Sequence, residues 1–225
     1  MIHGGIIHND EHYMNLLIQN KYYLIPIVNI DAVAHIQEIF EKTGKLEPRR
    51  KSMNFSDAGP EPCPNPEWER KGIDLNRNYP VDWDTGAALK GGNSDDPCSG
   101  SFRGSVPFSE PETKAYSDFL IAHQKEIKFV YNFHTYGNMY LWPYNGSSPN
   151  DIEKRNPGVM GIFQDIVKQS TWPSGTIHAS AWGGLHYESS GEAEDWILAQ
   201  LGIPAVCPEI GSDDYFSEQF TIPYR

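Results

Sequence analysis

The residues of this sequence that could do chemistry stand at the ends of apolar stretches. His134 directly follows the apolar stretch 127–133, and Glu209 lies within another, 203–210, between Pro208 and Ile210. Burying a carboxylate costs free energy unless it is paired or functional, so Glu209 is a strong candidate for a functional group. A single histidine at a strand end is more often structural. In open α/β sheets functional residues gather where strands end, and both residues would lie there.

A third candidate group lies in the segment 72–79, whose sequence is Gly-Ile-Asp-Leu-Asn-Arg-Asn-Tyr. The guanidinium of Arg77 offers a two-pronged fork that matches a carboxylate, and the amide of Asn76 adds a further donor. This pair is therefore suited to binding a carboxylate.

These groups need a sheet and helices to position them. Apolar stretches at 22–29, 127–133, 139–142 and 203–210 predict buried strands. Helical spacing predicts helices at 10–20, 32–42, 109–125, 151–169 (broken by Pro157) and 191–201. The alternation indicates an α/β fold with a mixed central β-sheet flanked by helices, in a single domain over residues 1–225.

The segment 45–108 has little periodicity and is rich in Gly, Pro, Asn, Asp and Ser. Loops this long in compact domains are usually functional, although a floppy insertion is the alternative.

Composition excludes some partners. The chain carries 18 Lys and Arg against 30 Asp and Glu, which gives a net charge of −12. Because a protein needs a basic face to bind nucleic acid, this composition argues against nucleic acid as a partner. An acidic protein would instead attract cationic substrates. Neither an apolar stretch long enough to span a membrane nor a signal peptide is visible in the sequence.

Five segments, in order along the chain, resemble the zinc carboxypeptidases of the carboxypeptidase A/B family. They are 74–79 (Asp-Leu-Asn-Arg-Asn-Tyr), 102–113 (Phe-Arg-Gly-Ser-Val-Pro-Phe-Ser-Glu-Pro-Glu-Thr), 132–136 (Asn-Phe-His-Thr-Tyr), 187–196 (Tyr-Glu-Ser-Ser-Gly-Glu-Ala-Glu-Asp-Trp) and 208–211 (Pro-Glu-Ile-Gly). The resemblance implies the fold of that family and a zinc enzyme that hydrolyses the C-terminal bond of peptides and proteins.

The resemblance assigns three residues to the reaction. His134 matches a zinc ligand, and Glu209 matches the general base that takes a proton from zinc-bound water. Arg50 resembles the arginine that polarises the scissile carbonyl, with Arg49 as the alternative.

It assigns four others to substrate. Asn76 and Arg77 match the pair that binds the terminal carboxylate, and Tyr187 matches the mobile tyrosine that closes over substrate. Glu194 falls where the family sets side-chain preference, so it would favour C-terminal Lys or Arg, although a solvated helix glutamate is an equal alternative.

One part of the family pattern is not found in place. A catalytic zinc takes three protein ligands, and the family draws two of them from a His-x-x-Glu motif. The string from His8 to Glu11 has this form, but no buried strand precedes it, so we expect the true motif upstream of Met1. A family helix is also expected beyond Glu209, so the domain is expected to be incomplete at both ends.

Three explanations follow: a partial sequence, a second chain that completes the sheet, or a non-catalytic relative that serves as a structural, assembly or peptide-binding subunit.

The cysteines give an indication of the cellular compartment of the protein. Cys63 and Cys98 lie in Pro-rich loop sequence, where cysteines can be bridged, and Cys207 lies in a predicted buried strand. The resemblance implies a disulfide between Cys63 and Cys98. Together with the glycosylation sequons at Asn54 and Asn145, this indicates a secreted or luminal protein.

Overall fold

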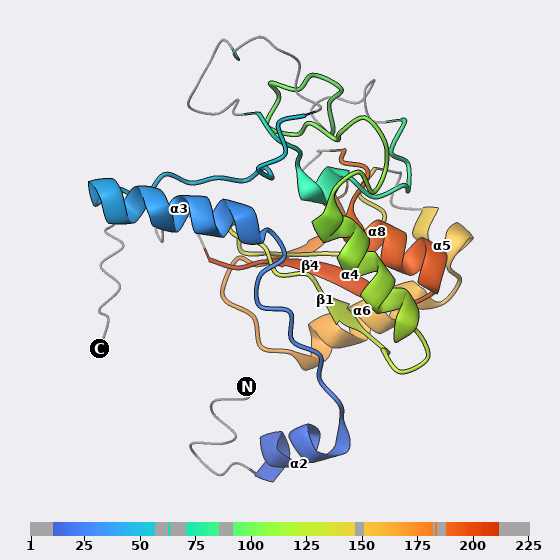
Figure 1. The fold of residues 1–225 in the computed structure, drawn as a ribbon. Helices are drawn as coiled ribbons and strands as arrows, with labels where there is room; N and C mark the ends of the chain where they lie inside the picture. Colours follow the sequence, from blue (N-terminus) through green and yellow to red (C-terminus); the bar gives the residue numbers. More distant parts are fainter. Residues whose placement is uncertain are drawn as a thin grey trace.

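The computed structural model describes residues 11–56, 63, 71–85, 92–146, 151–181, 183 and 188–211. Within them one mixed sheet has the strand order β1-β4-β2-β3 (Figure 1). Strands β1 (Val130–Tyr131) and β4 (Ala205–Glu209) are parallel, β2 (Met139–Leu141) runs antiparallel to β4, and β3 (Ile177–Ala179) is parallel to β2. The predicted mixed α/β fold is therefore confirmed, and β4, which carries Glu209, is paired on both sides.

The helices mostly match the predicted ranges, and the first of them, α2, lies apart from the sheet (Figure 1). They are α2 (Glu11–Gln19), α3 (Ile30–Thr43), α4 (Pro111–Ala122), α5 (Asp151–Arg155), α6 (Val159–Gln169) and α8 (Ala193–Trp196), which continues as a π-helical turn (Ile197–Leu201). The break expected at Pro157 separates α5 from α6. In α3 the Asn29 side chain accepts a hydrogen bond from the Ala32 amide, and Gly44 ends the helix at φ +68°.

One apolar core joins α4, α5, α6 and α8 to the sheet. Tyr140 of β2, Val206 of β4, Phe163 of α6 and Ile197 after α8 are each 0% exposed and belong to the same cluster as Leu120 of α4. The continuous apolar sequence of β4 is explained by this burial, since helices cover the sheet in which it lies. None of the described helices is long and apolar enough to cross a membrane.

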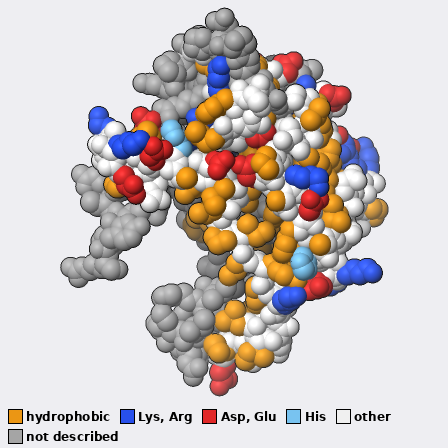
Figure 2. Space-filling view, in the orientation of Figure 1, with side chains coloured by type: hydrophobic (Ala, Val, Ile, Leu, Met, Phe, Trp, Pro, Cys, Tyr) orange, Lys and Arg blue, Asp and Glu red, His pale blue; other side chains and the backbone are white. Residues whose placement is uncertain are grey.

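The segment 22–29 differs from the prediction. It forms no strand and connects α2 to α3 along the surface, where Figure 2 shows hydrophobic side chains exposed. Leu24 is 73% exposed and Ile27 is 47% exposed. An apolar stretch becomes a strand only where a partner strand accepts its hydrogen bonds, and no described strand pairs with this one. Conversely, the short strand β3 was not predicted.

Candidate active site

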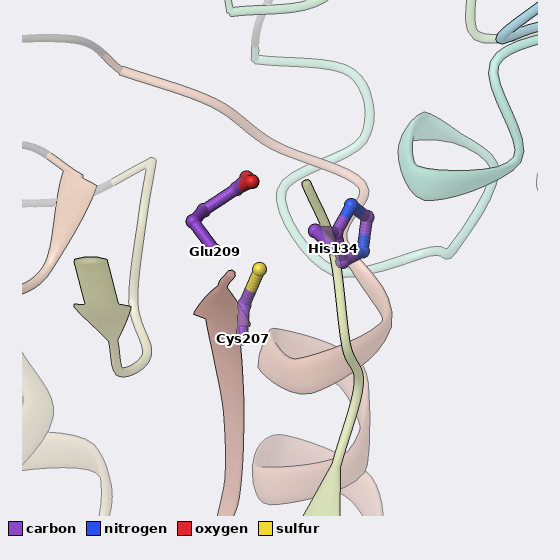
Figure 3. A group of neighbouring side chains, drawn as sticks. All are labelled: His134, Cys207 and Glu209. Carbon is purple, nitrogen blue, oxygen red and sulfur yellow. The ribbon is translucent and has the colours of Figure 1, made fainter. Parts of the chain in front are cut away.

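Two neighbouring strand ends bring three reactive side chains together. Cys207 and Glu209 are two residues apart in β4, so their side chains leave the same face of the sheet. His134 lies beside Glu209: its amide donates to the Pro208 carbonyl at 2.9 Å, and its own carbonyl accepts from the Ile210 amide at 2.9 Å. Figure 3 shows the imidazole, the thiol and the carboxylate at this end of β4. The predicted convergence of His134 and Glu209 is thus what the backbone pairing produces.

These three side chains form a group of metal-binding donors. One donor atom from each of His134, Cys207 and Glu209 lies within 4.8 Å of the others. Nitrogen, sulfur and oxygen are the donors that zinc takes in proteins, so the chemistry of this group fits the zinc that the family resemblance implies. Glu11 is exposed in α2 and is not part of the group, and His8 lies outside the described residues.

A second group is held by the short 3₁₀ turn Leu75–Arg77. The buried Asp74 caps this turn by accepting the Asn76 amide at 3.1 Å, and it also accepts Nε of Arg50 at 2.8 Å. The Asn76 side-chain oxygen accepts the Ala193 amide at 3.0 Å. The turn therefore fixes Arg50, Asn76 and Arg77 to one another and to the start of α8.

Glu192 lies on the wall of the cavity that these groups line, although the sequence did not single it out. Its Oε1 accepts Nη1 of Arg77 at 3.0 Å and the Ser189 hydroxyl at 2.5 Å, and its Oε2 accepts Nδ2 of Asn145. The Arg77 and Glu192 side chains are only 6% and 8% exposed. Arg77, the arginine predicted to bind a terminal carboxylate, is therefore itself paired with a buried carboxylate.

Gly191 explains how Glu192 reaches Arg77. It has a φ of +72°, and a Cβ there would lie 2.3 Å from the Arg77 carbonyl oxygen. Its own carbonyl accepts the Tyr79 amide at 3.0 Å, and its amide donates to Val81 at 3.0 Å. Only glycine allows the segment before α8 to approach the 72–79 segment this closely.

The two groups line one small cavity of about 80 Å³. Its walls include Arg50, Asn76, Arg77, His134, Glu192, Cys207 and Glu209. Five of these seven were predicted to be site residues, and only Glu192 and Cys207 were not. Arg50 rather than Arg49 lies on the wall; Arg49 donates instead to the carbonyls of Ser52 and Lys71.

Burial dominates the electrostatics of the cavity. It raises the pKa of Glu209 to about 7, against the opposing positive charge of Arg50. Burial and then the charge of Arg50 lower the pKa of His134, which favours the neutral imidazole that can bind a metal. For Asp74 burial acts to raise the pKa, but the charges of Arg50 and Arg77 outweigh it and hold the pKa below its usual value.

Two other predicted substrate residues are placed differently. Glu194 is 0% exposed and is not on the cavity wall; its Oε2 accepts Nδ2 of Asn132 at 3.2 Å. Burial and then the neighbouring charge of Glu192 raise the pKa of Glu194 to about 7. It is thus not a solvated helix glutamate, because the interior encloses it. Tyr187 lies outside the described residues.

The three cysteines divide into one bridged pair and one free thiol. Cys63 and Cys98 form a disulfide, as the resemblance implied, and Cys207 is free and buried. Of the two sequon asparagines, Asn145 is 1% exposed with its amide bonded to Glu192, so it cannot carry a glycan in this fold.

Comparison with known proteins identifies the family of this chain. A family model described as zinc carboxypeptidase matches residues 5–224. Over 196 residues the chain is 31% identical to mast cell carboxypeptidase A of Homo sapiens, covering 84% of this chain and 40% of that protein. It is 29% identical over 190 residues to carboxypeptidase B of Bos taurus, with the same two coverages.

Solved structures share the fold. The structure of thrombin activatable fibrinolysis inhibitor matches 91% of this chain and 46% of its own, with a TM-score of 0.59 and 24% identity. Carboxypeptidase A from Helicoverpa armigera matches 82% of this chain and 41% of its own, with a TM-score of 0.53 and 24% identity. The chain spans about 40% of the length of the sequence relatives named above. On the match across residues 5–224, this chain belongs to the zinc carboxypeptidase family.

Proposed function

We propose that the protein is a metallocarboxypeptidase that removes the C-terminal residue of peptides or proteins. The observation that carries this proposal is that Arg50, Asn76, Arg77, His134 and Glu209 line one cavity. A carboxylate-binding pair, a metal-binding imidazole and a carboxylate base are the groups that such a reaction needs.

Arg77 and Asn76 would bind the terminal carboxylate of the substrate. The Asn76 side-chain oxygen is already used by the Ala193 amide, so its NH₂ group is the end left to donate to a ligand. A peptide bond inside a chain offers no carboxylate to this pair. The preference for the last residue follows from that difference.

Glu209 would act as the general base, because a pKa of about 7 suits proton transfer near neutral pH. Arg50, anchored by Asp74, would face the negative charge that develops on the scissile carbonyl oxygen. His134 would hold the zinc, together with ligands from beyond the described residues. When bound, zinc supplies Lewis-acid polarisation and lowers the pKa of water.

The preference among C-terminal residues is a further part of the proposal. Glu194, behind the cavity wall, together with the net charge of −12, would favour Lys or Arg. Tyr187 would close over the bound substrate.

The test uses the zinc-loaded protein and peptides ending in Lys, Arg, Leu or Phe, each with a free or an amidated C-terminus. We expect free amino acid to be released only from peptides with a free carboxylate, and Glu209→Gln to abolish release. Glu41→Gln, on the exposed surface of α3, is the matched control and should retain it. Equal release from amidated peptides, or full activity of Glu209→Gln, would contradict the proposal.

A second candidate is a catalytically inactive peptide-binding or assembly subunit, favoured by two observations: the apolar side chains of 22–28 are exposed, and the β1 edge of the sheet is open among the described strands. A second chain that completes the sheet could cover this surface. The same peptides distinguish the two candidates, provided that the zinc content of the protein is measured. Peptide binding that depends on the free carboxylate, without release of an amino acid, would favour the inactive subunit.

The disulfide between Cys63 and Cys98 supports a secreted or luminal location, since such bonds persist in oxidising compartments.

A further inference from the structure

Lys51 follows Arg50 in the chain, and its side chain is buried although it carries a charge. Lys51 is only 4% exposed, whereas the Arg50 side chain, on the cavity wall, is 51% exposed. We propose that Lys51 is a positioning residue for Arg50, which it fastens to the loop 94–102 that the Cys63–Cys98 disulfide holds in place. The inference rests on the proposed function, because it concerns how Arg50 is presented to the scissile carbonyl.

The ammonium group of Lys51 lies among carbonyl oxygens of this loop. Its Nζ donates to the carbonyls of Pro97 and Ser99 at 2.8 Å each and lies 5.9 Å from the centre of the Phe102 ring. Burying an ammonium group costs free energy unless hydrogen bonds replace the water that it loses, and the two carbonyls supply such bonds. Pro97 and Ser99 flank Cys98, so the disulfide lies next to both carbonyls that hold the ammonium group.

The same loop also holds the residue that binds the Arg50 side chain. The amide of the buried Asp74 donates to the Phe102 carbonyl at 2.8 Å, and its Oδ2 accepts Nε of Arg50 at 2.8 Å. Arg50 is thus anchored to the loop 94–102 by two routes: through Lys51, its neighbour in the chain, and through Asp74 at its Nε.

A half-exposed arginine depends on such anchors. A long side chain at the surface has many accessible rotamers, and each rotamer that points away from the cavity removes the positive charge from the oxygen where negative charge develops. The backbone around Arg50 has other contacts as well: Asn29 Nδ2 donates to the Arg50 carbonyl at 2.8 Å, and the Ser52 amide donates to the Ile73 carbonyl at 2.8 Å. Loss of the Lys51 link should therefore let the guanidinium move while these bonds still hold the segment.

The first test measures the mobility of the Arg50 side chain by ¹⁵N relaxation and does not depend on activity. The Nε–H signal of Arg50 is identified by its absence from Arg50→Met. We expect the order parameter of this bond, on the picosecond-to-nanosecond timescale, to fall by at least about 0.2 in Lys51→Met. The double variant Cys63→Ser/Cys98→Ser should lower it as well. Lys45→Met, at an exposed lysine just after α3, is the matched control and should leave it unchanged.

A second variant covers the case in which Lys51→Met does not fold. Lys51→Gln keeps an NH₂ group that can donate to one carbonyl of the loop, so it should give a smaller fall of the order parameter.

The second test follows peptide release by the zinc-loaded protein. Because Arg50 would act on charge that develops in the transition state, Lys51→Met should lower kcat at least about tenfold and change KM less than about twofold. In an Arg50→Met background the same substitution should have almost no further effect on kcat, since no guanidinium is left to position. A lysine that only stabilised the fold would lower the active fraction equally in both backgrounds.

The inference is overturned if folded Lys51→Met or Lys51→Gln leaves the Arg50 order parameter unchanged, or if the effect on kcat is the same with and without Arg50. Failure of the carboxypeptidase proposal is a different result. The wild-type protein would then release no amino acid, while the order parameter would still show whether Lys51 positions Arg50.

Discussion

Replacing Glu192 by glutamine should destabilise the protein strongly, because it breaks the buried ion pair with Arg77. Both side chains are less than a tenth exposed, so solvent screens the pair little. Glutamine keeps the size of the side chain, but its NH₂ group must face either Arg77 or the Asn145 amide, and both are donors. Breaking a buried pair typically costs about 3–5 kcal/mol, and we expect about 3 kcal/mol here because one acceptor remains.

Urea unfolding followed by circular dichroism measures this loss. Arg77→Met and the double variant complete a thermodynamic cycle, in which the double variant should lose less than the sum of the single losses. Glu38→Gln removes a solvent-exposed pair with Lys42 and is the control, which should leave the unfolding free energy close to that of the wild type because water screens such a pair. A loss below about 1 kcal/mol for Glu192→Gln, or additive single losses, would refute the reasoning.

Three further perturbations test other parts of the structure. In metal-free protein, Glu194→Gln should have the same unfolding free energy as the wild type near pH 4.5 and a larger one above pH 7. The folded protein holds a proton on Glu194 up to about pH 7 and the unfolded chain only to 4.5, so wild-type stability falls between these values by about 3 kcal/mol. Urea unfolding at several pH values measures this effect. A stability difference between the variant and the wild type that stays the same at every pH would contradict it. Cys98→Ser opens a disulfide of sequence separation 35 and should lower the unfolding free energy by roughly 3–4 kcal/mol; an unchanged urea midpoint would argue against it. Phe163→Ala, at a side chain 0% exposed in the core, should cost about 3–5 kcal/mol, and a loss in thermal or urea unfolding below about 1 kcal/mol would show that the core collapses around the gap.

Part of the site follows from sequence because it depends on local patterns. His134 follows the apolar stretch 127–133 and Glu209 ends β4, and the pairing of these two segments brings His134 beside Glu209. The pair Asn76 and Arg77 lies in a turn capped by its own neighbour Asp74, so its geometry is also local.

The rest depends on contacts between distant segments. Glu192 reaches Arg77 only because Gly191 adopts a positive φ against the Arg77 carbonyl, and no periodicity in 187–196 indicates that approach. Cys207 was expected to be buried in a strand, but its place on the cavity wall depends on which face of β4 is turned toward that cavity.

The segment 22–29 is the opposite case, because its sequence predicts a strand that the fold does not form. Its apolar sequence predicts burial, but a strand needs neighbours that the segment itself does not encode, and those side chains are exposed in this fold. The strand β3, by contrast, is three residues long and too short for an alternating pattern to identify.

The position of β4 between β1 and β2 has a consequence for how the protein opens. Backbone amides of a strand bonded on both sides exchange with deuterium slowly, since exposing them requires the sheet to come apart. Cys207 and Glu209 therefore belong to the most cooperative unit of the fold, whereas the surface segment before α3 can fray without disturbing them. In native-state hydrogen exchange the protection of residues 205–209 should track global unfolding, so the reactive end of β4 should keep its shape until the molecule as a whole melts.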